Sequence, residues 1–201
     1  MYGSTPTPTQ SFPSGIISLH VPQNSVVEHS SNVCSTYYYI IVFIHGLTED
    51  RESTWRAAAN SSDPWPKTLL SPIIPNARIL TFGYDAYVTD WKTMLSQNRL
   101  GCHSWNLLTR LATHREADNT NDRPIIFVCH SLGGLVCEYA LTISARRSDE
   151  HLKKISNYTR DIAFLATPHH GSGLVQWAEK LAHVVGVLKQ VNRDISKVLK
   201  G

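Results

Sequence analysis

The stretch that decides the fold reads Ile125-Ile126-Phe127-Val128-Cys129-His130-Ser131-Leu132-Gly133-Gly134-Leu135-Val136. An apolar run ends at Ser131 and passes at once into two glycines and a helical pattern. This order predicts a strand, a tight turn that carries the serine, and a helix. Such a turn strains the serine backbone by roughly 1–3 kcal/mol and leaves its hydroxyl clear of the sheet edge. The stretch therefore predicts a nucleophile elbow.

The residues around Ser131 fit this interpretation. Neighbouring elements crowd such a turn, and the residues two before and two after the serine are small, Cys129 and Gly133. Apolar residues at helical spacing follow, namely Leu132, Leu135, Val136, Tyr139, Ala140 and Ile143. A helix that starts here directs its N-terminus at negative charge developing on the serine. The alternative is a Ser-x-Gly-Gly turn without chemistry.

Length and composition bound the class of protein. A chain of 201 residues is expected to form one domain and is long enough to bury a hydrophobic core. Its 42% hydrophobic and 17% charged content indicates a globular protein. A net charge of +3, with scattered basic residues, argues against nucleic acid. Residues 1–14 are rich in Ser, Thr and Pro and are expected to form a disordered tail before a single domain at residues 15–201.

The start of the chain and its cysteines suggest a reducing compartment. Residues 1–15 lack the basic start and apolar core of a secretory signal, and no apolar run is long enough to span a membrane. The four cysteines, Cys34, Cys102, Cys129 and Cys137, form no C-x-x-C pattern. We expect free thiols and a cytoplasmic location.

Strand and helix patterns alternate along the chain. The expected strands cover residues 15–21, 36–44, 78–82, 125–130 and 161–166. The expected helices cover 66–70, stretches of 94–116, the segment after Ser131, and 174–198, with a charged connector at 148–157. This alternation predicts an α/β fold with a mostly parallel sheet flanked by helices on both faces.

Five blocks together carry a resemblance to a known superfamily. They are Val42–Leu47, Trp65-Pro66, Ile79–Asp85, Val128–Leu135 and Phe164–Ser172. Their order and spacing over roughly residues 36–180 resemble the α/β-hydrolase superfamily, and more closely its SERAC-type lipase-like esterases and the SesB-type hydrolase domains of fungi. Members of this group usually have an arginine where His170 stands.

The resemblance implies roles for particular residues. Ser131 would be the nucleophile, and the backbone N–H groups of Leu132 and Leu47 would form the oxyanion hole. His45 would shape the turn after its strand rather than act as a base. The resemblance also implies an alternative location at a mitochondrial or endoplasmic reticulum membrane.

The catalytic acid and histidine have no counterpart at the family's positions. In the superfamily they follow later strands, and here the chain ends one helix after Ala166. His169 and His170 are candidates for a substitute base. We therefore expect the N-terminal half of a hydrolase: the front of a longer enzyme, a shortened paralogue, or a chain whose sheet a protein partner completes.

Two functions follow from these observations. The first is a serine hydrolase of carboxylic or lipid acyl esters that works through an acyl-enzyme on Ser131. The second is a non-catalytic pseudo-hydrolase, a signalling or scaffold module related to effector domains of fungal immune-receptor-like proteins. No metal or other cofactor is expected, because adjacent histidines lack the spacing of a zinc helix. The apolar stripe at 174–198 allows peripheral membrane contact.

Overall fold

The computed structural model describes residues 13–22, 39–47, 50–58, 61–86 and 97–169. Several expectations fall outside these ranges. They are most of the tail at 1–14, the start of the strand at 36–44, the start of the helix at 94–116, the base candidate His170, and the stripe at 174–198 with its proposed membrane contact.

Five strands form one sheet at the centre of the described structure. In chain order they are β1 (Gly15–His20), β2 (Ile40–Ile44), β3 (Arg78–Gly83), β4 (Ile125–His130) and β5 (Thr159–Leu165). Their order across the sheet is β1-β3-β2-β4-β5. β1 runs antiparallel to β3, and the other neighbours are parallel. The predicted mostly parallel sheet is confirmed, with one antiparallel strand at its edge.

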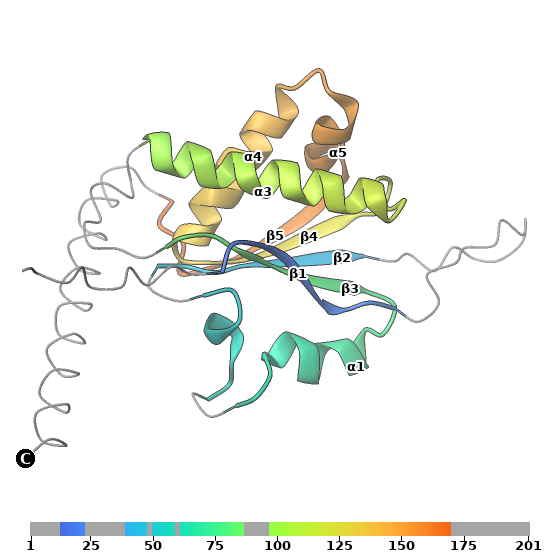
Figure 1. Ribbon diagram of the computed structural model, residues 1–201, viewed down its shortest axis with the longest axis vertical. Helices are drawn as coiled ribbons and strands as arrows, with labels where there is room; N and C mark the ends of the chain where they lie inside the picture. The colour runs from blue at the N-terminus through green and yellow to red at the C-terminus, as the bar shows by residue number, and fades with distance from the viewer. Residues whose placement is uncertain (1–12, 23–38, 48–49, 59–60, 87–96, 170–201) are drawn as a thin grey trace, which may run out of the picture.

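Three helices cover one face of the sheet (Figure 1). They are α3 (Gln97–Ala117), α4 (Leu132–Ala145) and α5 (Glu150–Tyr158). The larger core lies between them and the sheet, around Val42, Leu80 and Phe127. β2 is buried at all five positions, as expected for a parallel strand covered on both faces.

The opposite face is covered by the segment between β2 and β3 (Figure 1). This segment holds the short helical turns η1 (Ser53–Trp55), η2 (Pro66–Leu70) and α1 (Ser71–Ile73). Trp55 and Trp65 pack edge-on against Phe43 of β2, with ring centroids 4.9 and 5.5 Å apart. Farther along this face, Leu165 of β5 is 44% exposed.

Two details of the predicted helices were wrong. The charged connector at 148–157 is mostly helix α5, because Leu152 and Ile155 are buried against the core and Ser144 holds the helix by two hydrogen bonds. Tyr139, which the periodicity placed on the buried face of α4, is 42% exposed. The buried residues of α4 include Gly133, Gly134, Cys137 and Ser144, so its buried face includes the two glycines and leaves Tyr139 outside.

The cysteine prediction is confirmed where it can be examined. Cys102, Cys129 and Cys137 are free thiols, and Cys34 lies outside the described residues. The cytoplasmic location inferred from them stays a prediction. Within the described residues, no helix is long and apolar enough to cross a membrane.

Candidate active site

Ser131 occupies the turn between β4 and α4. β4 ends at His130, and α4 begins at Leu132. The backbone of Ser131 has φ 54° and ψ −123°, a conformation that L-residues with a side chain rarely adopt. Its cost is roughly 1–3 kcal/mol, so the surroundings must hold it in place. The residue is 7% exposed.

Three hydrogen bonds hold the Ser131 backbone. Its N–H donates to the carbonyl of Leu165 at 2.8 Å. Its own carbonyl accepts from the N–H of Gly134 at 3.2 Å and from the hydroxyl of Thr167 at 3.1 Å. Two of these partners lie at the end of β5 or just after it. The strained turn is therefore held by the neighbouring strand as well as by its own helix.

The turn after β2 lies directly against Ser131. A Cβ atom built on Gly46 would lie 2.7 Å from Cβ of Ser131 and 3.0 Å from Nδ1 of His130, so only glycine fits. The register that pairs Ile44 with Cys129, extended by two residues, places Gly46 opposite Ser131, and Leu47 follows in the chain. The first N–H groups of α4 have no partner within a helix by its geometry. The start of α4 and the turn after β2 thus meet at Ser131.

Gly133 lets α4 approach β2 closely. A Cβ atom at this position would lie 2.5 Å from the carbonyl oxygen of His45 and 2.6 Å from that of Ile44. Both atoms belong to the backbone and cannot move aside independently. This contact sets the distance between the start of α4 and the turn at Gly46.

His45 has a structural position, which agrees with the role that the resemblance implied. Its ring is buried and stacks on Tyr84, with centroids 4.4 Å apart. The N–H of Tyr84 donates to Nε2 at 3.2 Å, so Nδ1 carries the proton and donates to the carbonyl of Gly46 at 2.8 Å. Burial lowers the pKa of the imidazole to about 4. A neutral ring with both nitrogens occupied shapes the turn.

This buried histidine predicts a loss of stability in mild acid. The unfolded chain binds a proton on His45 below its ordinary pKa of 6.5, whereas the folded chain does so only near 4. Its stabilising contribution is complete above 6.5 and is lost as the pH falls, by about 3 kcal/mol over the whole interval. Burial also lowers the pKa values of His103 and His114, which act in the same direction.

Urea unfolding at about pH 7 and about pH 5 measures this effect. The His45→Asn variant is the matched control, because the Asn side chain can still donate to Gly46 but cannot titrate. We expect the variant to be less stable at neutral pH and to lose less stability on acidification. An equal loss in both proteins would show that His45 does not titrate in this range.

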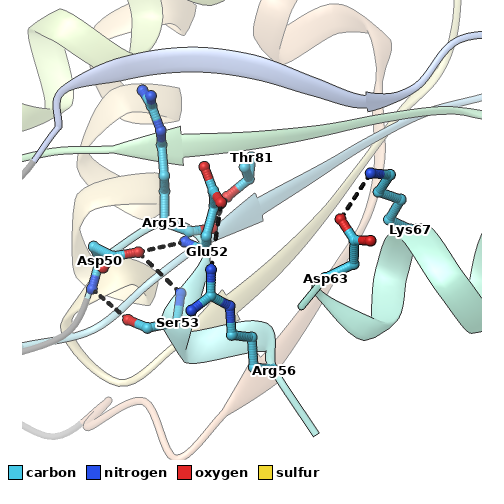
Figure 2. Close-up of polar contacts among 8 residues, drawn as sticks. All are labelled: Asp50, Arg51, Glu52, Ser53, Arg56, Asp63, Lys67 and Thr81. Carbon is cyan, nitrogen blue, oxygen red and sulfur yellow. Dashed lines mark hydrogen bonds and ion pairs between the residues drawn. The ribbon is translucent and has the colours of Figure 1, made fainter. Parts of the chain in front are cut away.

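The segment that begins at Asp50 is anchored to the sheet (Figure 2). The Asp50 carboxylate accepts from the N–H groups of Glu52 at 2.7 Å and Ser53 at 2.9 Å. Thr81 of β3 donates its hydroxyl to the carbonyl of Arg51 at 2.7 Å. The Arg51 guanidinium also donates to the carbonyl of Gly15 in β1. These contacts hold the segment from Asp50 to Ser53 against β1 and β3.

Of the two base candidates, His169 and His170, the structure describes only the first. The ring of His169 packs on Phe164, with centroids 4.5 Å apart, and its Nδ1 lies 3.2 Å from a carboxylate oxygen of Glu138. Glu138 is seven residues beyond Ser131, about 10 Å along α4. The structure thus pairs His169 with α4 rather than with the serine hydroxyl. His170 lies outside the described residues.

Sequence reasoning missed two contributors to this site. Gly46 and Thr167 both lie in the blocks that resemble the hydrolases, but neither spacing nor periodicity indicates that they contact Ser131. The part of the chain that the structure describes contains no group of three or more His, Cys, Asp or Glu side chains that could hold a metal ion.

The sheet order and the strand–serine–helix turn define an α/β-hydrolase fold. A similar solved structure is the mature lipase BlEst2 of Bacillus licheniformis, with a TM-score of 0.54 and 20% identity over 87% of this chain and 57% of that chain. Residues 35–196 match the family described as "Putative serine esterase (DUF676)". The chain belongs to this family.

Curated relatives are several times longer than this chain. It is 31% identical to Protein SERAC1 of Bos taurus over 173 residues, which cover 78% of this chain and 25% of that protein. It is 28% identical to Protein SERAC1 of Danio rerio over 163 residues, 72% of this chain and 24% of that protein. The chain thus spans about a quarter of the length of the relatives it matches.

Proposed function

We propose that this chain is a serine hydrolase domain that acts on carboxylic or lipid acyl esters, with Ser131 as nucleophile. The observation that carries the proposal is the strained backbone of Ser131, held against the turn at Gly46. Strain of this kind persists where the surroundings impose it, and it is common at catalytic positions. On this proposal, the turn presents the hydroxyl beside the backbone N–H groups of Leu132 and Leu47, which would form the oxyanion hole.

The reaction follows from this arrangement. The Ser131 hydroxyl loses its proton to a base as its oxygen attacks the ester carbonyl carbon. The carbonyl oxygen becomes an oxyanion, which accepts hydrogen bonds from the N–H groups of Leu132 and Leu47. Each such donor contributes about 2.7–4 kcal/mol to lowering the barrier. The C–O bond then breaks, the alcohol leaves with the proton, and water hydrolyses the acyl-enzyme.

Of the two base candidates, His169 lies within the described residues, with Glu138 as its carboxylate partner. A carboxylate at Nδ1 leaves Nε2 as the proton acceptor, which is the relation between acid and histidine in serine triads. To take the serine proton, the imidazole would have to leave its place beside α4. His170 stays the second candidate.

Active-site titration with a fluorophosphonate probe tests the proposal. We expect one adduct per chain by intact mass, mapped to the peptide that contains Ser131. The His169→Gln variant should label far more slowly if His169 is the base, since loss of the base in a serine triad costs around 10⁶-fold in turnover. Equal labelling of this variant would exclude His169 and direct attention to His170.

One observation favours a second function, the non-catalytic signalling or scaffold module. His169 is paired with Glu138 rather than with Ser131. An oxyanion hole without a base leaves only about 10³–10⁴-fold acceleration over water. On this hypothesis, the exposed side chains of β5, such as Leu165, would contact a protein partner that completes the sheet. A folded chain that forms no fluorophosphonate adduct would support it.

A further inference from the structure

The peptide unit between Ser131 and Leu132 links the serine to the expected oxyanion donor. Its carbonyl belongs to Ser131 and its N–H to Leu132. No peptide bond of the described residues is cis, so the C=O and N–H of this unit point in opposite directions. Whatever fixes the direction of the Ser131 carbonyl therefore also fixes the direction of the Leu132 N–H.

The Thr167 hydroxyl donates to this carbonyl at 3.1 Å. The second donor is the N–H of Gly134, at 3.2 Å. Both distances are long for their kinds of hydrogen bond, so neither bond alone holds the carbonyl tightly. Together they hold it from two elements, the start of α4 and the segment after β5.

We propose that Thr167 is a positioning residue whose hydroxyl holds the Ser131–Leu132 peptide plane and so aims the Leu132 N–H at the oxyanion. The proposal rests on the function proposed above, because it needs Ser131 to attack and Leu132 to donate. It adds to the proposed machinery a residue that acts through the Ser131 carbonyl.

The backbone around Thr167 directs its hydroxyl toward the Ser131 carbonyl. Leu165, the last residue of β5, accepts the N–H of Ser131 at 2.8 Å. Ala166 then has φ 56°, an uncommon value for a residue with a side chain, and this turns the chain so that Thr167 faces back toward the serine. Leu165 at the end of β5 and Thr167 two residues beyond it therefore hold the N–H and the C=O of Ser131.

Gly134 leaves the space that the Thr167 side chain occupies. A Cβ atom built on Gly134 would overlap Oγ1 and Cγ2 of Thr167 and lie 2.8 Å from its Cβ. The threonine side chain therefore packs closely on the first turn of α4, which restricts rotation of the hydroxyl. Its methyl group fills space, and its hydroxyl supplies the hydrogen bond, so substitution can separate the two contributions.

The test compares Thr167→Val, which keeps the shape and loses the donor, with Thr167→Ser, which keeps the donor and loses the methyl group. The readout is the second-order rate of fluorophosphonate labelling of the full chain. We expect labelling of Thr167→Val to be about 10–100-fold slower, since losing one oxyanion donor outright costs about 10²–10³-fold. Thr167→Ser should remain within about threefold of the unmodified chain, as expected when the donor is kept.

Two further measurements separate positioning from packing. Hydrolysis of p-nitrophenyl acetate should show a lower kcat for Thr167→Val at an unchanged KM. Urea unfolding should show that Thr167→Ser is destabilised although its labelling is fast. Thr142→Val is the matched control, because the Thr142 hydroxyl also donates to a backbone carbonyl of α4, that of Glu138 at 2.9 Å, away from the serine. It should label at the unmodified rate.

Each outcome decides the proposal. Unchanged labelling of Thr167→Val, or equal slowing of Thr167→Ser, would overturn the role of Thr167 while leaving Ser131 as nucleophile. A folded, unmodified chain that is not labelled would overturn the proposed function and this role with it. If Thr167→Val does not fold, Thr167→Ala replaces it, and labelling of this variant as fast as that of Thr167→Ser would overturn the role.

Discussion

Replacing Ser131 with alanine or glycine will abolish fluorophosphonate labelling, and the glycine variant will be more stable than the alanine variant. Both substitutions remove the hydroxyl that we propose as nucleophile. In a serine protease, loss of the serine reduces turnover by about 10⁶-fold, so any residual labelling should be undetectable. The stability difference follows from the backbone at φ 54° and ψ −123°.

The sizes of two opposing contributions, backbone strain and the freedom of the unfolded chain, predict which of the two variants is more stable. Glycine relieves strain of roughly 1–3 kcal/mol, whereas alanine keeps a Cβ atom and keeps most of the strain. Glycine also costs about 0.5–1 kcal/mol through the greater freedom of the unfolded chain. We therefore expect Ser131→Gly to gain about 1 kcal/mol over Ser131→Ala, measured as the free energy of urea unfolding.

A Ser131→Gly variant more stable than Ser131→Ala would show that the folded protein retains backbone strain at the position of the proposed nucleophile. Ser148→Gly is the control, because Ser148 is exposed in the connection between α4 and α5. It should label normally and should not become more stable. If Ser131→Ala still formed the adduct, another residue would be the nucleophile. If Ser131→Gly were the less stable of the two variants, the backbone strain would be absent.

The Gly133→Ala variant should lose about 3 kcal/mol of stability or more, at or beyond the upper end of what overpacking usually costs. The added Cβ would lie 2.5–2.6 Å from two backbone oxygens, those of His45 and Ile44. Backbone atoms of a central strand can move only if the strand moves. Relief therefore requires α4 to withdraw from β2, which would also separate Leu132 from the turn at Gly46.

Gly101→Ala provides the matched control. Gly101 lies within α3, and a Cβ atom there would meet only Cε1 of Tyr139, at 3.5 Å. Alanine in a helix interior is favoured over glycine by roughly 0.5–1 kcal/mol, so this variant should be slightly more stable. Urea unfolding and the fluorophosphonate labelling rate measure both variants. A Gly133→Ala protein with unchanged stability would contradict the close approach of α4 and β2.

Local patterns predicted most of the described elements. The β-branched and aromatic runs at 78–82 and 125–130 gave strands within one residue of those observed, because a parallel strand buried on both faces needs such runs. α5 was missed because nine residues with two buried apolar side chains, Leu152 and Ile155, are too few to show a period. Its stability comes from contact with α4, which no local pattern records.

The sequence by itself determined the strand, the serine turn and the start of the helix, because these depend on neighbouring residues: an apolar run, Ser131, and glycines that tolerate crowding. Only the tertiary structure decided what surrounds the serine. The carbonyl of Leu165 and the hydroxyl of Thr167 are 34 and 36 residues away along the chain, and Gly46 is 85 residues away. They meet Ser131 because the order β1-β3-β2-β4-β5 places β2 and β5 on either side of β4 and brings their carboxyl ends to one edge. Strand order depends on how the whole chain buries its apolar surface, and no local pattern carries that information.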